Sequence, residues 1–406
     1  MQYRTVPKNG DKLSALGFGC MRLPQKGRAI NEERAIKQIR YAIDNGVNYV
    51  DTAPPYHSGE SEKLLGKALL DGYRERVNVA TKLTHFMLNK PEDMGKMLDS
   101  QLQNLKTDHI DYYLLHALDA ESWEKLQGFD VLTFLNDAKA DGKIINAGFS
   151  FHGGRTTFKE IVDAYDWTNC QIQYNFLDED LQAGTEGLKY AASKNMAVMV
   201  MEPLRGGMLA GKLPKGVEQI YRDSGLQRPA AEWGLRWVWN HPEVTVVLSG
   251  MNDENHIAEN LKTAETALPN SMNSDELATV SKVAGSYKRL MKVPCTGCAY
   301  CMPCPQGVDI PNNFNIYNQY HMFSGKFMSR AMYAVMLMGL LTGKSVDASL
   351  CKECGKCAKH CPQRIAIPTE LKSVKSTLGG WQTKLMIPLI KRMMPFSPAK
   401  SDKESN

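Results

Sequence analysis

The chain has 406 residues, ten cysteines, 23% charged residues and a formal net charge of +5. These values are those of a globular protein with room for one large barrel and a smaller module, or for two or three ordinary domains. The mild charge gives little support for nucleic-acid binding. No export signal follows Met1 and no apolar run reaches the roughly 20 residues that cross a bilayer, so we expect a cytoplasmic protein without a transmembrane segment.

Short apolar runs alternate with helical stretches along the first 250 residues. The first run, 15–21, precedes a helical stretch that ends at Asn45-Gly46, a common helix stop. Further runs lie at 47–51, 77–81, 110–115, 144–149, 170–173, 196–201 and 244–248. Eight such βα units predict an α/β fold with a parallel sheet, a (β/α)8 TIM barrel.

Three of these runs end at an ionisable residue or one residue before it: Asp51, Lys82 and His116. A carboxylate at the end of a buried strand is costly without a partner, so Asp51 requires a nearby cation. Barrel strands end around one mouth, where these groups could meet Tyr56 from the loop beyond Asp51. Each residue also has a structural interpretation: a buried ion pair, a loop aromatic or a core histidine. Their joint occurrence favours a catalytic site.

This constellation resembles the aldo-keto reductase family over residues 1–285. The resemblance implies reversible hydride transfer between NAD(P)H and a small carbonyl or alcohol substrate. In that chemistry Tyr56 donates the proton, Lys82 lowers the pKa of the phenol, Asp51 holds Lys82, and His116 orients the carbonyl oxygen.

The resemblance also implies the dinucleotide contacts. They are Gly19, Cys20, Met21 and Asp51; Ser150 and Gln171 at the nicotinamide amide; Met201, Glu202, Pro203, Leu204, Gly206, Gly207 and Leu209 along the pyrophosphate loop; and Gly250, Met251, Asp253, His256, Glu259 and Asn260 around the adenosine. Phe151 stands where the family usually has asparagine, and Met201 where it usually has an aromatic ring. Relatives that prefer NADPH place Lys or Arg at the positions of Gly250, Asp253 or His256, which favours NADH here.

Several cations near these loops have two interpretations. Arg22, at the end of the first strand, either faces the mouth or is solvated at a turn. Arg205 is explained slightly better as a surface residue than as a phosphate contact. A 2′-phosphate could still be reached by one of Arg205, Arg222, Arg228 and Lys262.

Eight of the ten cysteines lie between Cys295 and Cys361. The second group, Cys351, Cys354, Cys357 and Cys361, followed by Pro362, has the C-x2-C-x2-C-x3-C-P spacing of bacterial ferredoxins. The first group, Cys295, Cys298, Cys301 and Cys304, has a shorter last interval. Two [4Fe-4S] clusters are expected in a ferredoxin-like domain over 286–372, one bound by Cys295, Cys298, Cys301 and Cys361 and the other by Cys351, Cys354, Cys357 and Cys304. Zinc is the competing metal.

The sequence of residues 373–406 predicts a basic amphipathic tail. Pro388 is expected to interrupt any helix in this tail, and the residues after Pro398 are expected to be disordered. Docking on the chain itself is favoured over docking on a partner or on a membrane surface.

A nicotinamide transfers two electrons at once, whereas a [4Fe-4S] cluster transfers one. Direct coupling therefore needs a group that divides the electron pair, such as a flavin. A bound flavin is possible, although the sequence has no secure flavin-binding motif. The first expectation is an iron-sulfur oxidoreductase that exchanges electrons with a ferredoxin-like partner. The alternatives are a reductase with structural or oxygen-sensing clusters, and a non-catalytic nicotinamide-binding regulatory or redox-sensing subunit. The substrate and the oligomeric state have no sequence signal.

Overall fold

The computed structural model describes residues 1–27, 29–266, 268–295, 297, 301–323, 325–340, 343–361 and 363–393. Its contacts divide the chain into two compact units. The first joins Met1–Gly211 to Leu226–Val280, and the second joins Lys212–Gly225 to the described residues from Ser281 onward. Each unit is described by itself below.

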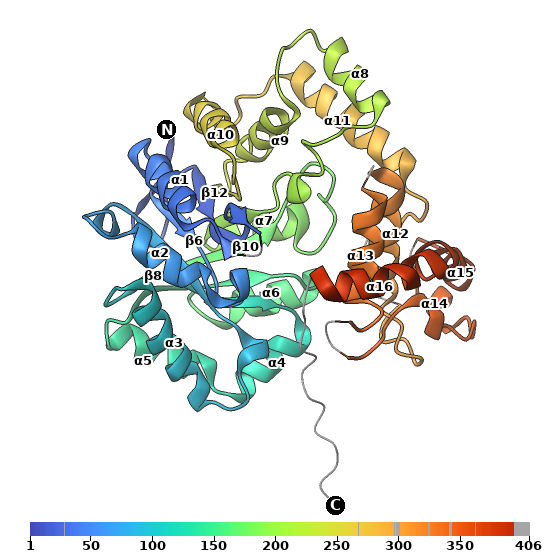
Figure 1. Cartoon of the computed structure of the whole chain (residues 1–406), viewed down its shortest axis with the longest axis horizontal. Coiled ribbons are helices and arrows are strands. Elements are labelled where there is room, and N and C mark those ends of the chain that lie inside the picture. The colour runs from blue at the N-terminus through green and yellow to red at the C-terminus, as the bar shows by residue number, and fades with distance from the viewer. Residues whose placement is uncertain are drawn as a thin grey trace, which may run out of the picture. The chain divides into compact units, whose positions relative to one another are not determined.

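The first unit contains a closed barrel of eight parallel strands (Figure 1). They are β3 (Leu16–Gly19), β6 (Tyr49–Asp51), β7 (Asn78–Leu83), β8 (Ile110–Leu118), β9 (Ile144–Phe151), β10 (Asn169–Gln173), β11 (Ala197–Met201) and β12 (Val244–Ser249). Neighbours in space follow the chain order, and β12 pairs with β3 to close the ring. The sequence prediction of a (β/α)8 barrel is therefore confirmed.

Side chains from alternate strand positions fill the barrel interior. Tyr49, Tyr112 and Met199 belong to one buried cluster there, together with Val6 and Leu13 from the N-terminal hairpin of β1 (Tyr3–Thr5) and β2 (Lys12–Ser14). Because side chains alternate along a strand, residues two positions beyond an interior residue point inward again. This periodicity carries polar groups to the carboxyl end of the same interior.

Helices surround the strands (Figure 1). They are α1 (Glu32–Asp44), α2 (Ser61–Ala68), α3 (Glu92–Leu105), α4 (Ala120–Gly128), α5 (Val131–Ala140), α6 (Arg155–Ala164), α7 (Gly184–Ser193), α9 (Ala230–Trp239) and α10 (Glu254–Thr266). The first of them shows how the sequence specifies them: Asn31 caps α1 by accepting a hydrogen bond from the Arg34 backbone N–H, and Ala35, Ile39 and Ala42 form its buried stripe. Short elements connect them: η1 (Cys20–Arg22), β4 (Gln25–Lys26), β5 (Ala29–Ile30), η2 (Tyr56–Gly59), η3 (Arg74–Arg76), η4 (His85–Met87) and η5 (Arg205–Gly207).

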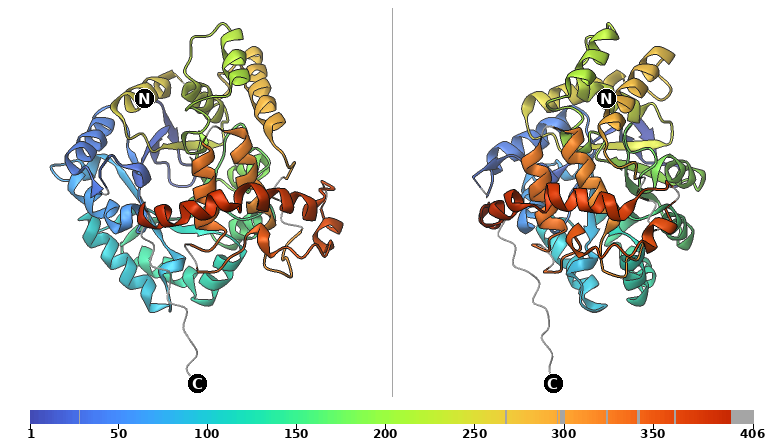
Figure 2. Two further views of the ribbon diagram at one scale, coloured as in Figure 1. Left: turned by 45° about the vertical axis from the view of Figure 1, so that its right-hand side comes forward. Right: turned by 90° about the vertical axis from the view of Figure 1, so that its right-hand side faces the viewer.

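The second unit is helical. It contains α8 (Lys215–Asp223), the part of α11 (Ser274–Leu290) from Ser281 onward, α12 (Ile310–Met322), α13 (Lys326–Met336), η6 (Ala348–Leu350), α14 (Lys356–Lys359), α15 (Ile367–Leu378) and α16 (Trp381–Met393). Helices α12 and α13 lie side by side (Figure 2). Phe314, Tyr333, Leu371 and Val374 form the core of this unit with ten further buried residues.

The C-terminal helix α16 packs on α13. Ile390 is buried against Ala331, Ala334 and Val335, so this segment docks on the chain itself. The helix runs through Pro388, contrary to the expected interruption. A proline removes one helical hydrogen bond, and the packing of α16 on α13 compensates for that loss. The stretch expected to be disordered lies outside the described residues.

None of the helices in the described ranges combines the length and the apolar character needed to cross a membrane.

Candidate active site

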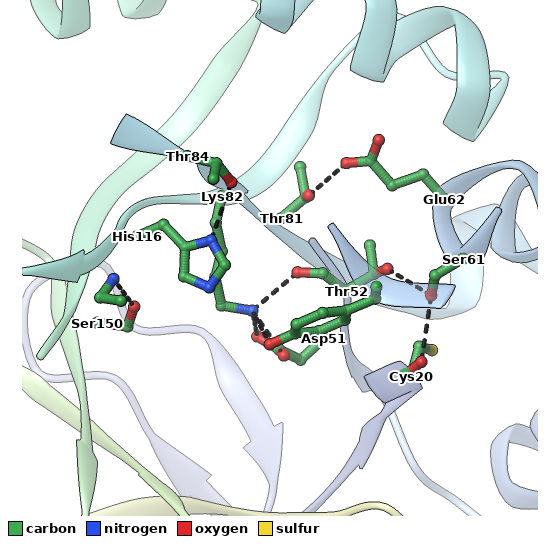
Figure 3. A network of polar contacts seen from close by, with 12 residues as sticks. Cys20, Asp51, Thr52, Ser61, Glu62, Thr81, Lys82, Thr84, His116 and Ser150 are labelled. Atoms are coloured by element: carbon green, nitrogen blue, oxygen red, sulfur yellow. Dashed lines mark hydrogen bonds and ion pairs between the residues drawn. The ribbon is translucent and has the colours of Figure 1, made fainter. Parts of the chain in front are cut away.

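Three neighbouring strands place Asp51, Lys82 and His116 at the carboxyl end of the barrel (Figure 3). Asp51 pairs in register with Ala80, and Lys82 lies two positions further along β7. Both side chains therefore project from the same face of the sheet. This register is the reason why the carboxylate and the ammonium meet.

The Lys82 ammonium is fully engaged by its neighbours. Its Nζ lies 2.7 and 2.8 Å from the two carboxylate oxygens of Asp51 and 2.8 Å from the backbone carbonyl oxygen of Thr52. Lys82 is 1% exposed and Asp51 3%. Burial lowers the pKa of Lys82, but Asp51 and Tyr56 together outweigh burial, and the pKa of Lys82 is raised. The side chain therefore stays protonated and fixed in position.

Tyr56 approaches this pair from the loop after β6. Lys82 Nζ lies 3.5 Å from the phenol oxygen and 5.1 Å from the ring centroid. Burial raises the pKa of Tyr56, while the Lys82 ammonium acts to lower it. The net direction differs from the sequence expectation, because the loss of hydration outweighs the ammonium. The phenol is thus held in its protonated form.

The loop that carries Tyr56 has an unusual backbone. His57, Ser58 and Gly59 have φ of 51°, 57° and 93°. Left-handed conformations at non-glycine residues are costly and persist only where other contacts hold them. His57 provides such a contact: its Nε2 accepts a hydrogen bond from the Leu23 backbone N–H at 3.0 Å. This role of His57 was not predicted, because no local pattern signals it.

His116 is aimed by an irregularity in β8. The pairing of β8 with β9 shifts register between Leu115 and Leu118, and Ala117 has a φ of 55°. Ser150 stabilises this bulge, because its hydroxyl accepts a hydrogen bond from the Ala117 backbone N–H at 2.7 Å. Bulges of this kind redirect a side chain. The His116 ring consequently lies 6.2 Å from the Tyr56 ring, edge to face.

The His116 imidazole is neutral. Burial lowers its pKa to about 2, and the charges of Lys82, His152 and His85 act in the same direction. Its Nδ1 lies 2.9 Å from the Thr84 hydroxyl oxygen (Figure 3). When Thr84 donates to Nδ1, Nε2 carries the ring proton and becomes a hydrogen-bond donor. Thr84, two residues beyond Lys82, is a second functional residue that was not predicted from the sequence.

Gln171 fits the amide of a nicotinamide. Its side chain is 2% exposed, and its Oε1 has no hydrogen-bond partner within the described part of the chain. A buried amide oxygen of this kind is costly unless a ligand satisfies it. Ser150 is different, because its hydroxyl is already used at the β8 bulge.

Directly after β3, the side chain of Cys20 is buried, whereas the next two residues are exposed. The Cys20 side chain is 0% exposed, and only its backbone carbonyl oxygen takes part in the site, accepting from Ser61 at 3.2 Å. Met21 is 60% exposed. Arg22 donates to the carbonyl oxygen of Gly206 at 2.8 Å and lies against Gly250. Of the two interpretations of Arg22, the structure supports the one in which it faces the mouth.

The segment expected to bind pyrophosphate is built from left-handed residues. Glu202, Arg205, Gly206 and Gly207 have φ of 52°, 50°, 67° and 91°. Arg205 is 7% exposed and forms an ion pair with Asp178 at 3.1 Å, so the surface interpretation of Arg205 is wrong. Pro203 and Leu209 are buried, whereas Glu202 is exposed and Met201 and Leu204 are half-buried.

The segment expected to bind the adenosine has its own ion pairs. Arg34 donates to Glu254 Oε1 at 2.8 Å and lies 3.5 Å from Asp253. It lowers the pKa of Glu254 to about 2, and Gln38 contributes. The buried Asn260 amide donates to Ser249 and contacts Met251, while His256 and Glu259 are exposed on α10. The Arg34 interactions were not expected from the sequence, because Arg34 and Asp253 are 219 positions apart in the chain.

A buried carboxylate supports β7 from behind. Glu62 is 3% exposed and accepts hydrogen bonds from Thr81 at 2.6 Å and from the Gln101 amide at 3.0 Å. The same Gln101 amide donates to the Lys82 backbone carbonyl oxygen at 3.0 Å. This network ties α2 and α3 to the strand that presents the ammonium.

The cysteines expected to bind iron lie in the second unit around its core. Six of them pack against that core: Cys295, Cys301, Cys304, Cys351, Cys357 and Cys361. Cys354 is exposed, and Cys298 lies outside the described residues. Burial raises the pKa of Cys357, and the neighbouring thiols of Cys304 and Cys351 add to the effect.

Thiolate donors in this number suit iron-sulfur clusters, each of which takes four cysteines. Within the described ranges, no three His, Cys, Asp or Glu side chains are placed to bind a single metal ion.

Comparison with known proteins identifies relatives of the barrel. Chains of similar sequence include a probable voltage-gated potassium channel subunit beta from Oryza sativa subsp. japonica (25% identity, 64% of this chain and 90% of the relative). They also include an L-galactose dehydrogenase from Arabidopsis thaliana (24%, 71% and 96%) and an NADH-specific methylglyoxal reductase from Escherichia coli (27%, 50% and 67%).

Solved structures and family models agree with these relatives. The holo form of an aldo-keto reductase from Bacillus halodurans superposes with a TM-score of 0.57 at 25% identity, over 70% of this chain and 96% of that chain. Residues 15–278 match the model of the aldo/keto reductase family, and residues 294–366 match that of the 4Fe-4S dicluster domain. The chain therefore belongs to the aldo/keto reductase family and carries a C-terminal 4Fe-4S dicluster domain.

Proposed function

We propose that the barrel catalyses NAD(P)H-dependent reduction of a small carbonyl compound, or the reverse oxidation, with Tyr56 as the proton donor. The observation that carries this proposal is the buried ammonium of Lys82, fixed by Asp51 and 3.5 Å from the Tyr56 phenol. The nicotinamide, when bound, supplies the hydride. Gln171 and the glycines at 206, 207 and 250 are proposed to hold the dinucleotide.

The chain's own residues supply the proton and the orientation. As hydride adds to the carbonyl carbon, negative charge develops on the oxygen. The protonated Tyr56 phenol donates a proton to that oxygen, and the adjacent Lys82 ammonium stabilises the phenolate that remains. The neutral His116 can donate a hydrogen bond from Nε2 to the same oxygen. In alcohol oxidation these proton movements run in reverse.

We propose NADH as the preferred dinucleotide. A 2′-phosphate needs an available cation, and three of the arginines that could serve it are already paired. Arg34 is bound by Glu254, Arg205 by Asp178, and Arg228 by Glu276. Asp253 adds a carboxylate that would repel the phosphate.

The clusters, when bound, supply one-electron transfer, and Cys295, Cys298, Cys301 and Cys304 with Cys351, Cys354, Cys357 and Cys361 are their proposed ligands. We propose that they exchange electrons with a redox partner protein. Whether a flavin mediates between the two chemistries is tested by a binding titration with FMN beside NADH and NADPH.

The decisive experiment compares the anaerobically purified protein with its Tyr56→Phe variant. The absorbance of NADH reports turnover on a panel of aldehydes, ketones and sugars. We expect the variant to lose about 10²–10⁴-fold in turnover while its affinity for NADH stays the same. Equal turnover in the two proteins would refute the assignment of Tyr56.

A second candidate function is a nicotinamide-binding redox-sensing subunit. It is favoured by the similarity of this chain to proteins described as probable potassium channel beta subunits. NADH binding without turnover on the whole panel would support it.

A further inference from the structure

The second cysteine motif and the residues that follow it, 351–375, are rich in positive charge. Between Cys351 and Lys375 the sequence has six cationic residues, which are Lys352, Lys356, Lys359, Arg364, Lys372 and Lys375. It has two carboxylates, Glu353 and Glu370, so this segment contributes +4 of the total +5. Between Cys295 and Pro311, around the first motif, Asp309 is the one charged residue. The two motifs therefore differ strongly in charge.

Most of this charge is presented to solvent. Lys352, Lys356, Lys359 and Arg364 are exposed, on the segment that contains α14. Lys372 on α15 forms an ion pair with Glu353 at 2.7 Å. As far as the described residues show, no carboxylate pairs with Lys356 or Lys359. Two unpaired ammonium groups on one short helix are available to a partner.

The same segment brings a metal ligand to the surface. Cys354 lies between these cations in the sequence and is exposed, whereas Cys304, Cys351 and Cys357 are half-buried. Rates of electron transfer between proteins fall steeply with distance, so a surface ligand marks the side from which a carrier can approach. The exposed cations and the exposed ligand of the second centre therefore belong to one short segment, 352–364.

We propose that this basic face, formed by Lys352, Lys356, Lys359 and Arg364 around Cys354, docks a small acidic protein that carries one electron at a time. The inference rests on the proposed function of the clusters. In each encounter the reduced carrier would lose one electron, and the centre held by the second motif would gain it. An exposed redox ligand favours a carrier protein over a nucleic acid or an anionic membrane, since neither of those delivers an electron.

The test uses the full chain with its clusters and a dithionite-reduced acidic two-cluster ferredoxin as the probe. Stopped-flow absorbance follows reduction of the protein's clusters under anaerobic conditions. The test variant carries two substitutions, Lys356→Glu and Lys359→Glu. The control variant carries Lys12→Glu and Lys189→Glu, which change the net charge by the same amount at exposed positions of the barrel. Iron content and the visible spectrum verify that each variant holds its clusters, and Lys356→Gln with Lys359→Gln gives a milder change.

We expect the second-order rate constant to fall by about tenfold or more in the α14 charge-reversal variant and to stay unchanged in the barrel control. The difference should vanish near 1 M salt, where the Debye length is about 3 Å. Equal rates in all variants at low salt would overturn the proposal. It would also be overturned if anionic vesicles or an oligonucleotide bound through α14 while the ferredoxin did not.

The Tyr56→Phe variant separates this inference from the proposed reductase activity. Cluster reduction by ferredoxin should be the same in that variant as in the natural sequence. If Tyr56→Phe loses carbonyl turnover while ferredoxin still reduces its clusters at the same rate, the proposed docking face is supported independently of the reductase activity.

Discussion

At the scale of single residues, the site depends on charges removed from water. Asp51 and Lys82 are almost fully buried, and each is the main neutralising partner of the other. A buried ion pair contributes little net stability, but the removal of one member leaves an uncompensated charge. The pair therefore holds the Lys82 ammonium beside Tyr56, and the stability of the protein becomes sensitive to the loss of either member.

The Lys82→Met substitution tests this view. We expect the free energy of unfolding to fall by about 3–5 kcal/mol, because the Asp51 carboxylate loses its partner. Burial already raises the pKa of Asp51, and the substitution raises it further. A raised folded-state pKa gives stability that is lost as the pH rises, so the deficit should be larger at pH 8 than at pH 5. Urea unfolding at both pH values measures it, and Asp51→Asn with Lys82→Met should recover part of the loss.

His116 gives a prediction about acid. Its pKa is lowered to about 2 by burial, whereas in the unfolded chain it is about 6.5. The unfolded chain therefore binds a proton below pH 6.5 that the folded protein refuses, and stability should decline as the pH falls from that value. Urea unfolding between pH 7 and pH 5 should show a smaller slope for His116→Asn. An equal slope in both proteins would contradict the neutral imidazole.

At the scale of elements, the site is held from behind by the contact between α2 and α3. A Cβ added to Gly66 on α2 would lie 2.3 Å from the Asn104 carbonyl oxygen and 3.0 Å from the Leu105 Cα. Such a contact is too short, and the obstacle is backbone. The helices can therefore pack this closely only with glycine at position 66.

Gly66→Ala should consequently destabilise the protein by about 1–3 kcal/mol, because the two helices must separate. Gly95→Ala is the matched control, since Gly95 lies inside α3 with no atom within 4 Å of an added Cβ. The control should gain about 0.5–1 kcal/mol from helix propensity. Thermal unfolding of the two variants measures both effects, and a similar shift in both would refute the packing argument.

At the scale of the whole molecule, two compact units with separate cores form the chain. The core of the second unit, here called the module, packs against six of the cluster cysteines. Bound clusters and the packing of this core should therefore stabilise each other. The barrel interior has its own cluster of buried residues and contains none of those cysteines. The stability of the module should therefore depend on iron, and that of the barrel should not.

Removal of iron with a chelator under oxidising conditions tests this independence. We expect the calorimetric transition of the module to shift to lower temperature or disappear, and the transition of the barrel to stay within about 2 °C. Iron analysis confirms the removal, and restoring iron and sulfide should bring the first transition back. An equal shift of both transitions would show that the units unfold together.

The sequence specified the barrel strands and their polar ends because these are local patterns. A strand of alternating or continuous apolar residues and the ionisable residue that ends it lie within a few positions of one another, as at Asp51, Lys82 and His116. The cysteine spacing is local in the same way. Eight strands and one pair of motifs could therefore be predicted from the order of residues alone.

Only the tertiary structure decided which of these groups are charged, and which are paired. The pairing of Arg205 with Asp178 and of Arg34 with Glu254, the bulge that aims His116, and the burial that holds Tyr56 protonated all arise between segments far apart in the chain. So does the grouping of Lys212–Gly225 with the C-terminal unit. The sequence by itself determined the residue types at the strand ends. Hydration and charge around them depend on through-space contacts, which exist only once the chain has folded.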